Sequence, residues 1–202
     1  MSAAVTRTLR TELARKALHL ATAALPIAWA FAVVDAAQLR LALTAAVVVA
    51  LVVEALRARS ARAAATFRAT VGPLLREHEA TRLTGATWLA LAMAGVVWFA
   101  PQPAALAALW AAAVGDATAA LAGLAFASWR GVATDGRKSL VGSCVAALST
   151  AVGCRWLLAA PWPVALALGV VAALAEWPRR PLDDNLRVAI AVALAAVALG
   201  LR

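Results

Sequence analysis

Asp116 is the residue of this chain whose position most strongly indicates chemistry. It lies inside the continuous apolar stretch 103–126, with more than ten uncharged residues on its N-terminal side. A charged carboxylate at the centre of a membrane helix costs about 2.5–3.5 kcal/mol, so an acid at this depth is a candidate for catalysis, metal binding or proton transfer. From the sequence alone, replacing Asp116 with asparagine is expected to relieve this cost and to leave the fold intact.

A second group of acids follows the sixth apolar stretch. Asp183, Asp184 and Asn185 are consecutive, and Glu176 precedes them by a short turn that contains proline. One aspartate is explained by helix capping, which contributes about 1 kcal/mol. Two adjacent acids exceed what a cap requires, and Mg²⁺ takes one or two carboxylates together with phosphate oxygens. We therefore expect Asp116, Asp183 and Asp184 to be the ligands of a divalent metal ion.

A candidate anion-binding turn precedes the apolar stretch 140–158. It contains Lys138 and Ser139, followed by Gly142 and Ser143. Backbone N–H groups and the positive end of the helix dipole favour anions at such a helix start. The segment is not a P-loop, because the GxxxxGK[ST] pattern is absent. The alternative interpretation is a capped loop without a ligand.

Further candidates lie near the first and third apolar stretches. Arg15, Lys16 and His19 stand at the start of the first stretch, where they could bind phosphates. The alternative is that the two basic side chains extend to the aqueous interface, as long basic side chains do. Arg76 and Glu79 precede the third stretch, where they could serve acid–base chemistry or form a solvated ion pair.

Gly115 begins a stripe of small residues at four-residue spacing, which continues with Ala119 and Gly123. Small residues in this pattern allow another helix to approach closely. Helix packing explains the stripe, but it leaves the neighbouring Asp116 unexplained.

The composition indicates which elements must position these side chains. Hydrophobic residues make up 64% of the 202 residues, charged residues make up 14%, and the mean hydropathy is +0.85. Soluble domains contain about 45–50% apolar residues. The apolar stretches are continuous rather than alternating, which favours helices over the strands of a barrel. We predict a single all-α domain over 1–202, a polytopic transmembrane bundle of about seven spans: 17–34, 39–56, 84–100, 103–126, 140–158, 161–177 and 186–201. The last two are short, so six spans and one partly embedded helix are the alternative.

The charge distribution predicts the orientation of this bundle. The net charge is +9, and a cytosolic N-terminus would place sixteen of the nineteen Lys and Arg residues on the cytosolic side. This asymmetry follows the positive-inside rule. It indicates anionic lipid headgroups as partners rather than nucleic acid. The sequence therefore predicts a multi-pass integral membrane protein with a cytosolic N-terminus and a site facing the cytosol.

The order of the motifs resembles that of the diacylglycerol/polyprenol kinase family, which includes CTP-dependent dolichol kinases, phytol kinases and diacylglycerol kinases. The motifs that carry this resemblance are RKALH (15–19), REHEATRLTGATW (76–88), VGDATAALAG (114–123), GRKSLVGS (136–143) and AEWPRRPLDDN (175–185). They extend over nearly the whole chain. Val141 stands where the family often has an acid, and Leu124 and Ser128 stand where a basic residue and a glycine often follow the GD motif.

This resemblance implies a membrane enzyme that transfers the γ-phosphoryl group of a nucleoside triphosphate, typically CTP, to a lipid alcohol with the help of Mg²⁺. The alcohol would be a polyprenol or dolichol, phytol or diacylglycerol. The resemblance assigns catalysis to Asp116, Lys138, Glu176 and Asp184, and nucleotide or phosphate binding to Arg15, Lys16, His19, Arg76, Lys138, Ser139, Gly142, Ser143 and Asn185. It adds Glu79, Gly115 and Asp183 as neighbouring site residues.

Two other functions compete with the kinase. A cytidylyltransferase similar to CDP-diacylglycerol synthases would also combine acids, Lys/Ser-Gly turns and CTP. A transporter or non-catalytic membrane protein could use Asp116 as a proton relay. Such a protein would not need the Lys138-Ser139 turn or the Asp183-Asp184-Asn185 segment.

Overall fold

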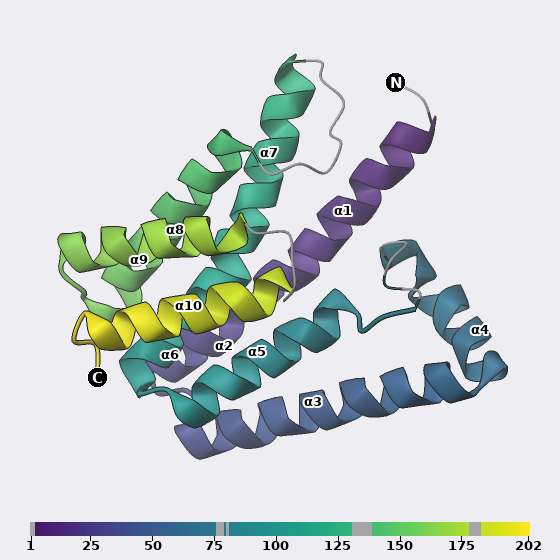
Figure 1. Cartoon of the computed structure of the whole chain (residues 1–202), viewed down its shortest axis with the longest axis horizontal. Coiled ribbons are helices and arrows are strands. Elements are labelled where there is room, and N and C mark those ends of the chain that lie inside the picture. Colours follow the sequence, from purple (N-terminus) through teal and green to yellow (C-terminus); the bar gives the residue numbers. More distant parts are fainter. Residues whose placement is uncertain (1–2, 76–78, 80, 131–138, 178–182) are drawn as a thin grey trace.

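A computed structural model of the chain describes residues 3–75, 79, 81–130, 139–177 and 183–202. Within these residues the regular elements are all helices (Figure 1), which confirms the all-α prediction. They are α1 (Ala3–Ala21), α2 (Ala24–Ala30), α3 (Ala36–Arg59), α4 (Ala61–Thr70), the 3-10 turn η1 (Gly72–Leu74), α5 (Gly85–Phe99), α6 (Gln102–Trp110), the π-helical turn η3 (Ala111–Gly115), α7 (Asp116–Arg130), α8 (Leu140–Leu158), α9 (Trp162–Glu176) and α10 (Asp184–Ala198).

Three helical segments in the described part of the chain are both long enough and apolar enough to cross a membrane. They are α3, the continuous segment Gln102–Phe126 formed by α6, η3 and most of α7, and α8. These segments correspond to the second, fourth and fifth predicted spans. Helices α5 and α9 are apolar but shorter, at 15 residues each. The three long segments are consistent with a membrane protein.

The first predicted span is not one helix. The stretch 17–34 is divided between the end of α1 and the short helix α2. Pro26 has no N–H to donate to the carbonyl of Thr22, and proline disfavours a helical conformation in the residue before it. The N–H of Thr22 instead donates to the carbonyl of His19, only three residues back, at 3.0 Å. The prediction of a continuous helix over this stretch was therefore wrong.

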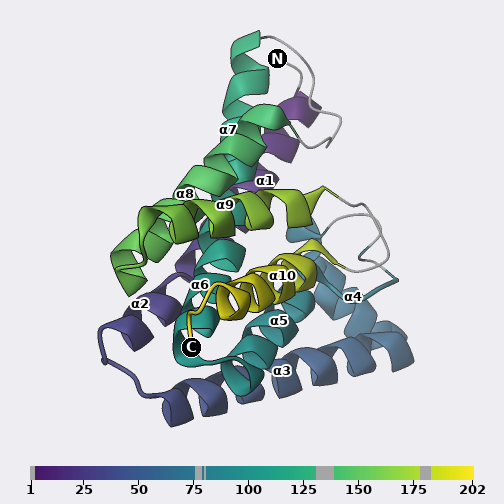
Figure 2. The ribbon, with the colours of Figure 1, turned by 60° about the vertical axis from the view of Figure 1, so that its left-hand side comes forward.

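Helix α6 forms the centre of the bundle. It packs against α2, α5, α8 and α10 (Figure 2), and its residues from Ala104 to Leu109 are almost completely buried. Four of these six residues are alanines, whose small side chains let neighbouring helices approach closely. The alanine-rich sequence thus provides a tightly packed centre around which the longer helices lie.

The outer surface of the bundle is strongly apolar. On α9 the exposed side chains Trp162, Leu166, Val170, Leu174 and Trp177 recur every three or four residues and form one stripe. Fifteen steps of about 1.5 Å give this stripe a length of about 22 Å. Tryptophan at both ends of an exposed apolar surface is typical of a helix that contacts lipid, with indole rings at the headgroup levels.

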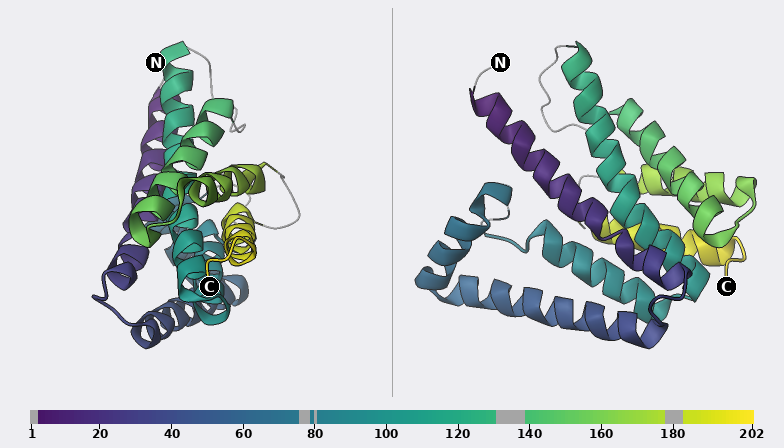
Figure 3. Two further views of the ribbon diagram at one scale, coloured as in Figure 1. Left: turned by 90° about the vertical axis from the view of Figure 1, so that its left-hand side faces the viewer. Right: turned by 180° about the vertical axis from the view of Figure 1, so that it is seen from behind.

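The oblique path of α1 brings its C-terminal half to the middle of the bundle. It runs beside α7 and also contacts η1 and η3 (Figure 3). The C-terminal ends of α3 and α9 and the N-terminal ends of α5 and α10 are the right-hand ends of these helices in Figure 1. This arrangement places polar side chains from α1, α5, α7 and α10 around one region.

Candidate functional site

The centre of the candidate site is an ion pair between α1 and α7. Lys16 Nζ lies 2.6 Å from Asp116 Oδ2, although the two residues are 100 positions apart in the chain. The side chains are only 7% and 13% exposed, respectively. Asp116, identified from the sequence by its position in an apolar stretch, therefore has a buried cationic partner.

His19 lies one turn after Lys16 on α1 and faces the same carboxylate. Its Nε2 is 2.8 Å from the carbonyl oxygen of Ala112, and its Nδ1 is 3.6 Å from Asp116 Oδ2. A carbonyl oxygen only accepts hydrogen bonds, so this contact assigns the hydrogen to Nε2. In the neutral imidazole, Nδ1 therefore carries the lone pair and can accept a proton.

The π-helical turn η3 positions both Asp116 and the carbonyl that holds His19. The N–H of Asp116 donates to the carbonyl of Ala111, five residues back, instead of following the four-residue spacing of an α-helix. The adjacent carbonyl of Ala112 accepts from His19. Turns of this kind are rare and occur frequently at functional sites.

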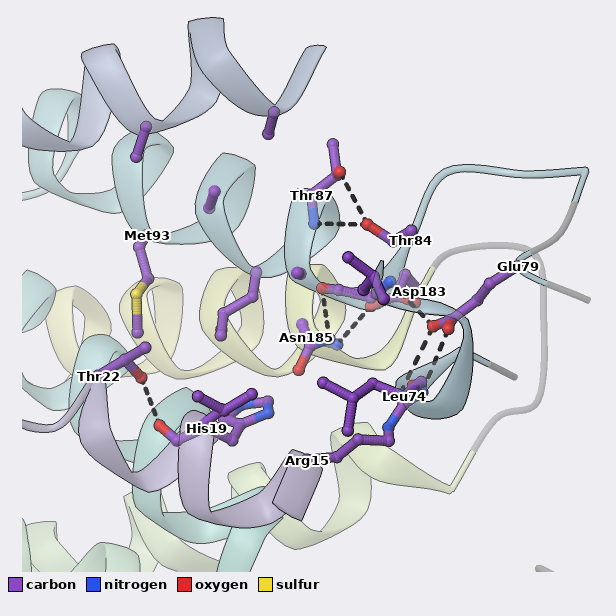
Figure 4. Close-up of a pocket in the computed structure, with 18 of the residues that line it drawn as sticks. Arg15, His19, Thr22, Leu74, Glu79, Thr84, Thr87, Met93, Asp183 and Asn185 are labelled. Carbon is purple, nitrogen blue, oxygen red and sulfur yellow. Dashed lines mark hydrogen bonds and ion pairs between the residues drawn. The ribbon is translucent and has the colours of Figure 1, made fainter. Parts of the chain in front are cut away.

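A second ion pair connects α1 with the segment before α5 (Figure 4). Arg15 Nη1 lies 3.1 Å from Glu79 Oε2 and donates to the carbonyl of Leu74 at 2.7 Å. Glu79 Oε1 accepts from the N–H of Gly85 at 2.9 Å. The Glu79 side chain is 4% exposed. Glu79 is therefore buried against Arg15, which excludes for this carboxylate the alternative of a solvated ion pair.

The acidic segment 183–185 begins α10. Asp183 Oδ1 accepts from the N–H of Asn185 at 3.0 Å, which confirms that one of the two aspartates caps a helix. Asn185 is buried, and its Nδ2 donates to the carbonyl of Gly85 at 3.4 Å. The start of α10 is thereby joined to the start of α5.

These groups surround one pocket of about 530 Å³. Most of its other lining residues are apolar and come mainly from α3 and α5, including Met93, which Figure 4 shows on the opposite side from Arg15. The pocket thus has a charged end and a hydrocarbon-like end. Eight residues predicted from the sequence line it: Arg15, Lys16, His19, Glu79, Asp116, Asp183, Asp184 and Asn185.

The segment that begins α8 lies outside the lining of this pocket. Ser139 Oγ accepts from the N–H of Gly142 at 3.0 Å and caps the helix. Ser143 Oγ accepts from Trp177 Nε1 at 3.0 Å. In the described residues these contacts are those of a capped, packed helix, the alternative interpretation of this motif. Lys138 and Arg76 lie outside the residues that the structure describes.

Gly115 at the end of η3 and Gly142 on α8 confirm the predicted close packing. A Cβ atom on Gly115 would lie 2.8 Å from Thr150 Oγ1, and one on Gly142 would lie 2.8 Å from the carbonyl oxygen of Ala119. Neither glycine lines the pocket. Their described contacts hold α7 against α8, and through α7 they support the position of Asp116.

Glu176 also lies outside the pocket lining. It is buried at the C-terminal end of α9. Arg187 donates to the carbonyls of Ala175 and Glu176, at 2.6 and 3.3 Å, and joins the end of α9 to α10.

Sequence reasoning missed Glu54, a buried acid on α3 that lines the pocket. Its Oε1 accepts from the N–H of Thr84 and the hydroxyl of Thr87, both at 2.9 Å, and its Oε2 accepts from Arg57. Arg57 also donates to the carbonyl of Glu79 at 2.9 Å. The signal was the one that identified Asp116, an acid inside an apolar stretch. This network holds Glu79 in position.

The predicted metal ligands share the pocket without forming a closed metal site. No group of three His, Cys, Asp or Glu side chains in the described residues is placed to hold a metal ion. Asp116, Asp183 and Asp184 all line the pocket. This donor set fits Mg²⁺ held jointly by one or two carboxylates and phosphate oxygens, and it does not fit an ion held by protein alone.

Comparisons with protein-family models, with curated proteins and with solved structures found no match. The function is therefore inferred from the pocket and from the motifs that surround it.

Proposed function

We propose that this protein is a membrane kinase that transfers the γ-phosphoryl group of a nucleoside triphosphate to the hydroxyl group of a lipid alcohol. The observation that carries this proposal is the pocket, in which a buried Lys16–Asp116–His19 cluster faces a largely apolar space. A lipid alcohol has a reactive hydroxyl and a hydrocarbon chain, and these two parts match the two ends of the pocket. The preference for CTP as donor rests on the resemblance of the motifs.

The charged end supplies what phosphoryl transfer requires. The reaction depends mainly on positioning and on neutralising the charge of the transferred group. Arg15 and Lys16 are cations that could bind phosphate oxygens, and both line the pocket. Asp116, Asp183 and Asp184 would hold Mg²⁺, which supplies further positive charge next to the phosphates when it is bound.

His19 is the proposed general base. The alcohol oxygen forms a bond to the γ-phosphorus, and the bond from that phosphorus to the oxygen bridging the β- and γ-phosphates breaks. The hydroxyl proton passes to Nδ1 of His19, whose Nε2 hydrogen is fixed by the Ala112 carbonyl. The products are a lipid monophosphate and a nucleoside diphosphate. Asp116, 3.6 Å from Nδ1, stabilises the imidazolium that forms.

The positions of basic residues support the proposed orientation, with a cytosolic N-terminus. The C-terminal end of α3 carries Arg57 and Arg59, and Arg57 donates to the carbonyl of Glu79, a residue of the charged part of the pocket. Arg40 and Arg155 lie near the opposite ends of α3 and α8. A cytosolic pocket opening would give direct access to soluble nucleotides.

The test follows each phosphorus atom of the donor. Purified protein in lipid nanodiscs is incubated with Mg²⁺, a panel of lipid alcohols, and CTP or ATP labelled at the α- or γ-phosphate. We expect γ-label in the lipid fraction, with nucleoside diphosphate as the soluble product. Label from the α-phosphate in lipid, with release of pyrophosphate from a lipid phosphate substrate, would assign the protein to the cytidylyltransferases instead. If neither label reaches the lipid fraction, both the kinase and the cytidylyltransferase functions are refuted.

A variant tests the base. His19→Asn removes the proton acceptor, and the loss of general base catalysis typically lowers kcat by about a hundredfold or more. The nucleotide KM should change little. Full activity in a folded His19→Asn protein would exclude the proposed role.

A further inference from the structure

The side-chain oxygen of Asn185 is a buried hydrogen-bond acceptor that receives no hydrogen bond from the described residues. The residue is 7% exposed, and its Oδ1 has no hydrogen-bond partner among the residues that the structure describes. Its Nδ2 donates to the carbonyl of Gly85 at 3.4 Å. The opposite amide orientation would place two carbonyl oxygens against each other, so the Gly85 contact fixes the assignment of nitrogen and oxygen.

The unpaired oxygen faces the pocket. Asn185 lines the pocket, and Figure 4 shows its side-chain oxygen on the side of His19. Buried acceptors are nearly always satisfied, because an unpaired one loses the hydrogen bonds that water would give it. We therefore expect the ligand of this pocket to donate a hydrogen bond to Asn185 Oδ1.

The walls beyond Asn185 indicate what else this ligand contains. One stripe of α3 faces the pocket at three- or four-residue spacing, with small side chains in the middle: Leu43, Ala46, Ala50 and Val53. Helix α5 contributes Leu89 and Met93 on another wall. Helix α3 is long and apolar enough to cross a membrane, and in the proposed topology this wall lies at the depth of the lipid chains. It fits hydrocarbon rather than a polar headgroup.

We propose that Asn185 Oδ1 accepts the hydroxyl hydrogen of the lipid alcohol when the alcohol binds without nucleotide, with the chain of the alcohol along the α3 and α5 walls. During phosphoryl transfer the same hydrogen passes to Nδ1 of His19. This inference rests on the proposed function and moves Asn185 from the nucleotide to the acceptor substrate. An alcohol has an O–H to donate, whereas the oxygens of a triphosphate or of an ionised lipid phosphate only accept. Asn185 would thus favour the alcohol substrate over the phosphorylated product.

The test measures binding without nucleotide, so it does not depend on catalysis. Radiolabelled hexadecanol and hexadecyl methyl ether, which lacks the O–H, are bound to the protein in nanodiscs. The wild type should bind the alcohol about tenfold more tightly than the ether, because the ether leaves the acceptor unpaired. Asn185→Leu should remove this difference by weakening alcohol binding. Equal binding of the two probes to the wild type would overturn the proposal, as would the absence of saturable binding.

A second pair of variants tests the hydrocarbon wall and does not alter Asn185. Ala50→Phe fills the space along α3 and should weaken binding of both probes about tenfold or more, because a bulky side chain displaces the chain. The matched control is Val49→Phe, since Val49 is 63% exposed and does not line the pocket. It should leave both affinities unchanged. Equal effects of the two substitutions would remove α3 from the binding site.

The outcomes separate this inference from the kinase proposal. Selective alcohol binding without transfer of γ-phosphate would refute the kinase and leave the alcohol site. Transfer of γ-phosphate by a protein that binds alcohol and ether equally would refute the role of Asn185 alone. If Asn185→Leu weakens binding of labelled CTP and keeps the preference for the alcohol, Asn185 belongs to the nucleotide site.

Discussion

Replacing Asp116 with asparagine should strongly destabilise the protein. From the sequence alone the substitution is expected to relieve a burial cost, but the structure reverses the sign. Lys16 is 6% exposed and lies 2.6 Å from Asp116 Oδ2, so the substitution leaves an ammonium group buried beside a neutral amide. Breaking a buried pair from one side costs about 3–5 kcal/mol, because the remaining charge stays uncompensated.

This magnitude is large enough to measure. For a chain of about 200 residues, each kcal/mol shifts Tm by about 2–4 °C, so Asp116→Asn should lower it by about 10 °C. The double variant Lys16→Met/Asp116→Asn removes both charges and should recover most of this loss. The coupling between the two positions should therefore exceed about 2 kcal/mol, within the range found for residues in contact.

The assay is unfolding of the purified variants in one lipid nanodisc composition. Asp35→Asn is the matched control, since it makes the same chemical change at the exposed N-cap of α3, where asparagine caps as well as aspartate. Its stability should change by less than about 0.5 kcal/mol. Asp116→Asn cannot be as stable as the control if the two residues form a coupled buried pair. The pair is also refuted if the stability lost in the double variant equals the sum of the losses in Asp116→Asn alone and Lys16→Met alone.

Two further predictions concern the packing and the orientation of the bundle. Gly115→Ala places a Cβ 2.8 Å from the Thr150 hydroxyl and should destabilise the protein by about 1–3 kcal/mol, whereas Gly95→Ala, with no atom within 4 Å of its Cβ, should be neutral or stabilising. Equal unfolding curves would show that η3 and α8 do not pack as described. The second prediction uses a variant without its native cysteines and a maleimide that does not cross membranes. Applied to intact cells, the maleimide should label Gln102→Cys, which lies outside in the proposed topology. It should label the cytosolic Arg62→Cys only after the cells are lysed. Labelling of both before lysis would contradict the proposed topology.

Features that depend on residues close together in the chain could be predicted from the sequence. The long apolar stretches identify helices because a segment in lipid must satisfy its own backbone hydrogen bonds. A cap formed by one of Asp183 and Asp184 was predicted, because capping involves only the next few residues. The break near Pro26 was also local, since proline lacks the required N–H. Pro26 was visible in the sequence, but the stretch 17–34 was interpreted as one helix because it is continuously apolar.

The membership of the candidate site was predicted in part. Titratable residues in apolar stretches are costly to bury, and this rule selected Asp116, which meets His19 in the structure. The same rule would have selected Glu54, which sequence reasoning overlooked. The sequence could not exclude Gly142 and Ser143 from the site, because a glycine-serine helix start has the same sequence pattern whether it binds an anion or packs against a neighbour.

The partners of these residues were decided by the tertiary structure alone. Lys16 and Asp116 are separated by 100 positions, as are Gly85 and Asn185, and no periodicity within one helix relates them. Their meeting depends on which helices pack together and at what angle, and those angles follow from the shapes of all the packed side chains. The sequence by itself determined an all-helical, strongly apolar chain with costly polar groups inside it. Only the packing of α1 against α7, and of α10 against α5, determined which of those groups neutralise one another and left the oxygen of Asn185 facing the pocket.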